Sequence, residues 1–207
     1  MAVPSSRGGP FYCDYGDPGA EVNAIEMYEL MRKVPGVNPF AATCQSAHET
    51  GRWTSKLWNE ARNGCGLKAG TDWMKARKPY ILIQSPEWDG HETVQRRSKF
   101  RAYATPEDFT QDYGEKIRTL YPACVEEADN FWGYFAGLYK GIWGKWATDP
   151  IYFTKLGKMA VTLAPELLGN GWRGRMGLAL NLAIDRGTLD DYQRKAAGKI
   201  IREVEEK

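Results

Sequence analysis

Apolar residues recur at helical spacing through most of this chain, and proline and glycine residues separate one such stretch from the next. The first stretch covers about residues 21–33 and ends at a Pro-Gly pair. Asn38-Pro39 opens the second, because Asn caps a first turn and Pro needs no N–H there. Later helices are predicted to begin at Thr105-Pro106, around Phe131 and at Asp149-Pro150, with a last one at Thr188, where Asp191 has capping-box spacing. The chain is therefore predicted to be mainly helical.

One segment departs from this helical pattern. Residues 80–84 read as a short strand, and a second strand is expected from Thr93 to near Tyr103, with the turn signal Asp89-Gly90 between them. Residues 59–79 are predicted to be loop. The expected fold class is α+β, a helical body with one small β-hairpin lobe. Three parts are expected: an irregular arm at 1–19, a main domain at 20–168 and a helical extension at 169–207, packed on or beside that domain.

Composition excludes several classes of protein. Hydrophobic residues make up 43% and charged residues 26% of the 207 residues, which is typical of neither a disordered chain nor a membrane protein. A net charge of +2 is too small to indicate nucleic acid as a partner. No apolar run reaches the ~18 residues of a membrane span. Residues 1–10 hold no hydrophobic stretch, so we expect either a signal that has been removed or a route to the substrate that needs none.

Cysteines and aromatic residues bear on the kind of site. The four cysteines form no C-x-x-C pair, so neither a zinc site nor another metal or organic cofactor is expected, and buried free thiols are the simplest interpretation. Their disulfide state is left open. The chain holds 8 Trp, 11 Tyr and 7 Phe, and some of these flat side chains are expected to line a groove where sugar rings stack.

Glu49 is the residue with the clearest chemical potential. It ends an otherwise apolar helix, where low dielectric and the negative end of the helix dipole both raise a carboxyl pKa. A raised pKa is what a general acid for glycoside cleavage needs. Composition alone favours the plainer alternative, a solvated Glu that happens to close a helix.

Six short sequence motifs favour the catalytic interpretation of Glu49 over the plainer one. The run from Gln45 to Gly51 resembles the glucosaminidase family of bacterial cell-wall hydrolases, the type found in flagellar muramidases and autolysins. Five more blocks follow in that family's order: Asn63–Lys68, Ser85–Trp88, Phe100–Tyr103, Asp112-Tyr113 and Trp146–Tyr152. The departures are Gly64 and Cys65 in the second block and Trp146 in place of a Tyr. The resemblance spans about residues 22–163, and it implies a lysozyme-like helical body and a catalytic domain at 20–168.

The resemblance implies a site with more than one carboxylate. Glu49 would protonate the leaving oxygen, Glu87 on the hairpin lobe would activate water, and Asp112 maps to a further carboxylate of the family's site. An inverting mechanism needs the two reacting carboxyls ~6.5–9.5 Å apart, and a retaining one needs them closer. Glu87 could instead be an exposed turn residue, with the substrate's own N-acetyl group taking its part, and Asp112 could be a surface charge on a helix.

Further residues are expected to bind substrate or support the site. The substrate-binding candidates are Trp146, Trp88, Asn63, Lys68 and Tyr152. The change to Trp at 146 implies either stacking on sugar or reduced activity, since indole loses the phenol hydroxyl and is a donor only. Arg101 and Tyr103 are expected to hold the lobe against the body, and His48 is expected to be structural.

The function implied by the resemblance is an endo-β-N-acetylglucosaminidase that cleaves peptidoglycan glycan strands. We expect the protein to be a monomer, although the sequence does not fix its oligomeric state. Two alternatives stay open: a lytic transglycosylase on the same polymer, and a catalytically weak wall-binding module. The expected place of action is the bacterial cell wall. An enzyme of a phage lysis system or virion is expected if no signal was ever present.

Overall fold

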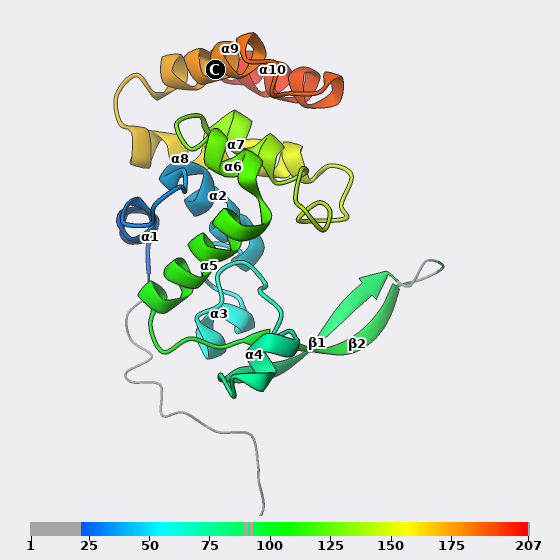
Figure 1. Cartoon of the computed structure of the whole chain (residues 1–207). Helices are drawn as coiled ribbons and strands as arrows, with labels where there is room; N and C mark the ends of the chain where they lie inside the picture. The colour runs from blue at the N-terminus through cyan, green and yellow to red at the C-terminus, as the bar shows by residue number, and fades with distance from the viewer. Residues whose placement is uncertain (1–21, 89–90, 92, 207) are drawn as a thin grey trace, which may run out of the picture.

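The computed structural model describes residues 22–88, 91 and 93–206, with side chains left out at 85–88 and 93–96 as well. Figure 1 shows helices stacked along the molecule with one hairpin extending from the lower half. The predicted α+β, mainly helical class is confirmed. The elements in order are α1 (Ala24–Arg32), α2 (Pro39–Thr50), α3 (Lys56–Ala61), α4 (Thr71–Lys75), β1 (Tyr80–Trp88), β2 (Thr93–Arg101), α5 (Pro106–Leu120), α6 (Pro122–Glu126), α7 (Phe131–Gly137), α8 (Tyr152–Leu168), α9 (Trp172–Asp185) and α10 (Asp191–Glu205).

Side-chain caps explain why helices α2 and α5 begin where they do. The Asn38 side chain accepts from the backbone N–H of Ala41, and Pro39 occupies the first position of α2. Thr105 and Asp108 form a reciprocal capping box at the start of α5. At the other end, α2 stops at Gly51, whose φ of 58° is left-handed and suits glycine.

Local sequence signals gave several boundaries wrongly. Residues 59–79 were predicted to be loop, but they include the end of α3 and all of α4, which are too short to show a helical period. The first strand extends to residue 88 rather than 84. Neither the helix at 152 nor the last helix is capped as predicted: Asp149 accepts from the N–H of Ile151 in the preceding turn, and Asp190 with Gln193, rather than Thr188, forms the final capping box.

The hairpin is joined to the body at its base. Its two antiparallel strands pair from Tyr80 with Arg101 to Trp88 with Thr93. The predicted turn at residues 89–90 lies outside the described residues. Backbone bonds from Ala69 to Lys99 and from Arg101 to Leu67 connect the base of β2 to the loop before α4. The lobe therefore depends on a few contacts at one end.

Helix α2 runs through the centre of the body. Nine of its 12 residues are buried, and most of them are small. It packs between α1 and α8, and its small side chains let both neighbours approach closely. Because its other residues are enclosed, the end of α2 is where a polar side chain can reach the surface.

Three of the four cysteines, Cys44, Cys65 and Cys124, are buried free thiols. Burial raises the pKa of all three, which keeps them protonated and unreactive. Cys13 lies outside the described residues.

Within the described part of the chain, every helix is too short or too polar to cross a bilayer.

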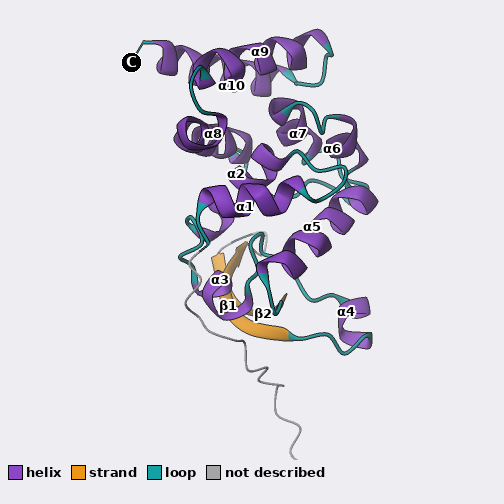
Figure 2. Ribbon diagram, turned by 90° about the vertical axis from the view of Figure 1, so that its left-hand side faces the viewer, coloured by secondary structure: helices purple, strands orange, loops and turns teal. Residues whose placement is uncertain are grey.

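Helices α9 and α10 lie across α8 and α7 at the end of the molecule opposite the hairpin (Figure 2). The indole N–H of Trp132 donates to the backbone oxygen of Met176, and the Asn130 amide donates to that of Ala179. Gly157 of α8 makes room for α10, since a Cβ there would lie 2.6 Å from Ile200 Cδ1 and 3.0 Å from the Trp132 ring. The last two helices are thus packed directly on the body.

Gly157→Ala should destabilise the fold by about 1–3 kcal/mol, because the added methyl group overpacks the contact between α8 and α10. Gly174→Ala in α9 is the matched control, since no atom lies within 4 Å of its Cβ position. That change should be neutral or stabilise by up to about 1 kcal/mol. Urea denaturation of both variants provides the measurement, and equal effects would contradict the packing described here.

Candidate active site

Glu49 is the next-to-last residue of α2 and is partly exposed, unlike the residues around it in the helix. The Tyr152 hydroxyl donates to its Oε1 at 2.6 Å, and the Trp146 side chain also hydrogen-bonds to the carboxyl. These donors come from α8 and from the loop before it, more than 90 positions along the chain. The fold therefore holds this carboxyl from outside its own helix.

Burial and hydrogen bonding act on Glu49 in opposite directions. Burial raises the pKa of the carboxyl and is the larger effect, whereas the bonds from Tyr152 and Trp146 lower it. The net result is a pKa above the ordinary value of a Glu. Such a group holds a proton at a higher pH than most carboxyls, as an acid catalyst requires.

A chain of buried hydrogen bonds leads inward from Glu49. The Gln45 amide donates to the Tyr152 hydroxyl at 3.1 Å, and the Tyr113 hydroxyl donates to Gln45 Oε1 at 2.7 Å. Tyr113 and Tyr134 share a further bond of 2.9 Å. Because the one proton of Tyr113 goes to Gln45, Tyr134 is the donor in that pair, so every bond of the chain points toward Glu49. Because the Gln45 amide donates to the Tyr152 hydroxyl, the proton of that hydroxyl is directed to Glu49.

Sequence reasoning gave no role to Gln45, Tyr113 or Tyr134. A signal did exist for Gln45, because it lies four positions before Glu49 and therefore on the same face of the helix. Tyr113 belongs to a block used for the resemblance, but without a stated role. Tyr134 lies in an aromatic-rich helix, where nothing local separates a hydrogen-bonding Tyr from a packing one.

Trp146 is half-buried beside Glu49. Its ring centre lies 5.3 Å from that of Tyr121 and 5.8 Å from that of Tyr113, and the Lys116 ammonium lies 4.8 Å from it. Its backbone N–H donates to Leu138. The indole thus supplies a donor to Glu49 from a packed position.

Tyr152, predicted to bind substrate, is 3% exposed, and its hydroxyl is occupied by Glu49 and Gln45. Its contacts are those of a residue that orients Glu49. His48 packs near the Tyr152 ring, at 5.7 Å between centres, and burial together with Lys155 lowers its pKa. His48 is thus held as a mostly neutral packing residue.

Asp112 is held by two partners. Arg101 Nη1 bonds to both of its carboxylate oxygens at 2.8 and 2.6 Å, and the Tyr103 hydroxyl donates at 2.6 Å. The Asp112 side chain is 14% exposed. These contacts join the end of β2 to α5, which is the holding role expected of Arg101 and Tyr103. The geometry favours an anchoring role for Asp112 as well, and its catalytic role stays a prediction.

Asn63 and Lys68 belong to the loop that meets the hairpin base. Asn63 is fully buried, and its amide donates to the backbone oxygens of Leu67 and Arg101 while its oxygen accepts from the N–H of Leu67. It therefore shapes the loop from inside. Lys68 is exposed, and its backbone oxygen accepts from Arg101 Nε.

Glu87 and Trp88 are at the end of β1 farthest from the body. Their side chains lie outside the described residues, so their predicted roles as base and as groove residue remain predictions. The Trp residues nearest these blocks in sequence, Trp53, Trp58 and Trp73, are all buried in the core.

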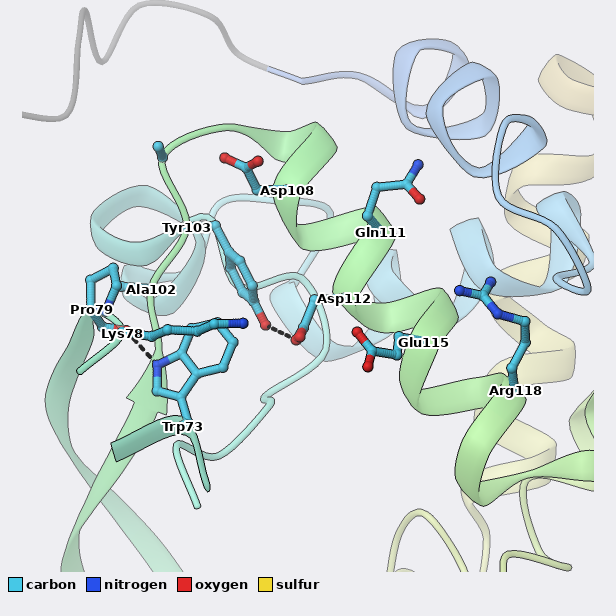
Figure 3. Close-up of a pocket in the computed structure, with 11 residues that line it drawn as sticks. Trp73, Lys78, Pro79, Ala102, Tyr103, Asp108, Gln111, Asp112, Glu115 and Arg118 are labelled. Carbon is cyan, nitrogen blue, oxygen red and sulfur yellow. Dashed lines mark hydrogen bonds between the residues drawn. The ribbon is translucent and has the colours of Figure 1, made fainter. Parts of the chain in front are cut away.

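A pocket of about 520 Å³ lies between α5 and the base of the hairpin (Figure 3). Its walls include Trp73, Tyr103, Asp112, Glu115 and Arg118, and Glu49 is not among its residues. Several of its polar groups are engaged within the protein: Trp73 donates to Pro79, and Arg118 donates to Pro35.

Among the described residues, no group of three or more His, Cys, Asp and Glu side chains could hold a metal ion.

The sequence matches the family model named Glucosaminidase, described as mannosyl-glycoprotein endo-beta-N-acetylglucosaminidase, over residues 25–164. None of the curated proteins matches it. Among solved structures it is similar to a mutant peptidoglycan hydrolase from Sphingomonas sp. A1, with 25% identity, a TM-score of 0.53 and coverage of 74% of this chain and 91% of that one.

Two further structures are similar. A truncated glycoside hydrolase domain of Salmonella typhimurium FlgJ is 25% identical, with a TM-score of 0.51 and coverage of 66% and 89%. The catalytic domain of the autolysin Auto from Listeria monocytogenes is 20% identical, with a TM-score of 0.53 and coverage of 67% and 78%, which shows a shared fold. The expected lysozyme-like arrangement of helical body and small hairpin is confirmed.

Glu49→Gln should stabilise the protein more at neutral than at acidic pH. Because the folded state raises the pKa of Glu49, the folded protein holds that proton more tightly than the unfolded chain does. The ionised carboxyl therefore costs stability as pH rises above about 4, the range where an unfolded Glu ionises. Melting temperatures of variant and wild type should diverge in the variant's favour between pH 4 and pH 8. Glu166→Gln on the exposed side of α8 serves as control, and a gap that stays constant or closes with pH would refute the burial argument.

Proposed function

This chain belongs to the glucosaminidase family, and we propose that it is an endo-β-N-acetylglucosaminidase that cleaves peptidoglycan glycan strands with Glu49 as general acid. The family supports a glycosidase acting on N-acetylglucosamine linkages. The similarity to a peptidoglycan hydrolase and to a flagellar glycoside hydrolase domain supports the cell-wall polymer as substrate. We further propose that the protein acts as a monomer at the wall.

The observation that best supports this proposal is the Glu49 carboxyl. It is partly exposed, burial raises its pKa, and two hydrogen-bond donors orient it. Tyr152 donates to Oε1, and in this proposal the transferable proton is carried by Oε2. In the proposed step Oε2 gives this proton to the glycosidic oxygen as the C–O bond breaks, and the leaving sugar departs as a neutral alcohol. General acid catalysis of this kind contributes roughly 10²–10⁴-fold in rate.

The second half of the reaction needs a group that takes a proton from water or assists at the sugar carbon. We propose Glu87 for this role, on the hairpin lobe, with Trp88 beside it in the groove. Should the two carboxyls lie ~6.5–9.5 Å apart with sugar bound, inversion follows. Participation by the substrate's own acetamido group is the alternative, and it would leave Glu87 with a minor effect.

The remaining candidates receive supporting roles in this proposal. Tyr152 and Trp146 position Glu49, Asp112 anchors the hairpin base, and Asn63 and Lys68 shape the loop beside it. Residues 20–168 are proposed as the catalytic domain, with 169–207 as an extension that packs on it rather than a separate binding module.

Glu49→Gln should lower the rate of wall clearing by at least about 100-fold, because the amide cannot donate the proton. Turbidity of purified peptidoglycan measures this, and Glu166→Gln is the matched control that should keep full activity. Mass spectrometry of the wild-type products tests the reaction itself, since hydrolysis adds water and leaves a reducing N-acetylglucosamine end. Anhydro products would identify a transglycosylase instead, and wall binding without any clearing by the wild type would identify a binding module.

Trp146→Phe should shift the alkaline limb of the activity profile to higher pH. The indole bond lowers the pKa of Glu49, so removing it raises that pKa while the aromatic packing remains. A general acid works only while protonated, and a higher pKa extends activity upward in pH. Tyr152→Phe should shift the limb further, because its bond has the larger effect. The measurement is kcat/KM against pH, and a shift to lower pH would contradict the assignment.

A further inference from the structure

Trp143 has an exposure that packing does not explain. Its side chain is 86% exposed, more than any other large hydrophobic residue among those the structure describes. Its neighbour Ile142 is 62% exposed. Both lie in the loop between α7 and α8, and the next Trp in that loop, Trp146, is packed against Glu49. A Trp of this size rarely faces water without a partner to cover it.

The backbone of this loop is tied down on both sides of Trp143. The N–H of Ile142 donates to Leu120, that of Gly144 donates to Gly141, and that of Trp146 donates to Leu138. A Cβ at Gly141 would lie 2.4 Å from the oxygen of Gly144, so the turn is tight. The indole is thus displayed by a preorganised loop, which lowers the entropy cost of binding.

The loop also sets how far Trp143 can be from the proposed acid. Three peptide units separate it from Trp146, which limits their Cα atoms to at most about 11 Å. Trp146 in turn contacts the Glu49 carboxyl. Figure 1 shows this loop and the hairpin extending from the same side of the molecule. Trp143 therefore stands within the span of a short oligosaccharide from Glu49.

Given the proposed function, on which this inference rests, we propose that Trp143 is a stacking platform for one sugar ring of the glycan strand, within a few sugar units of the bond that Glu49 cleaves. The C–H face of a pyranose is flat and apolar, and an indole face covers it, while the indole edge offers a donor to hydroxyl or acetamido oxygens.

A lipid surface is the other occupant that suits an exposed Ile-Trp pair with lysines nearby. The ammonium groups of Lys140 and Lys145 donate to the backbone oxygens of Thr188 and Thr148. Both bonds help to hold the loop, but each ammonium keeps its charge. The short stretch of chain between Trp143 and Trp146, which contacts the Glu49 carboxyl, is what favours sugar, and lipid binding is a distinct outcome of the test.

The test measures binding in a Glu49→Gln background, so that substrate is not consumed. The probes are purified peptidoglycan, soluble hexameric N-acetylglucosamine and vesicles of phosphatidylcholine with phosphatidylglycerol. Adding Trp143→Ala should weaken binding of both glycans about 10-fold, whereas Trp143→Phe should retain most of it. Leu178→Ala on α9, where Leu178 is 70% exposed, is the matched control and should change nothing. In the active chain Trp143→Ala should raise KM and largely keep kcat.

Unchanged glycan binding by Trp143→Ala would overturn the platform, and so would a loss confined to the vesicles. These outcomes are separate from failure of the proposed function. That function fails if the wild type releases no fragments, whereas the platform fails if position 143 does not affect glycan binding, whatever the wild-type activity.

Discussion

The hydrogen-bond chain from Tyr134 through Tyr113, Gln45 and Tyr152 to Glu49 is the constraint on which the site depends. It joins α7, α5, α2 and α8, so four helices must dock correctly before the last hydroxyl points at the carboxyl. Polarisation along such a chain strengthens each bond, and the same low dielectric makes any broken bond costly. The described residues leave no buried polar side-chain atom without a partner. The core therefore specifies the site as well as stabilising the fold.

Burial and hydrogen bonding act in opposite directions on the pKa of Glu49, and their balance determines how firmly the carboxyl holds its proton. An enclosed helix end withdraws solvent, which favours the neutral acid. The hydroxyl and the indole favour the anion, which forms once the proton has left. Trp146 supplies one of these two donors from the loop before α8.

Whether a feature could be predicted from the sequence depends on how far apart along the chain the interacting residues lie. The caps at Asn38 and Thr105 act over three residues, so their helix starts were predictable. The same rule failed at Thr188, because a hydroxyl that bonds back to Ala183 looks the same in sequence as a cap. Position 49 stood out through its motif, but the bond from Tyr152 spans 103 positions, and the bond between Gln45 and Tyr113 spans 68. Neither has a local signature.

The family match ends at residue 164, inside α8, which continues to residue 168. The residues after it cover rings of the core, since Met176 accepts the Trp132 N–H and Ile200 lies against Gly157. The packed structure therefore extends past the segment that the family model matches. Loss of residues 169–207 would therefore uncover rings of the core, which loss of a separately folded module would not do.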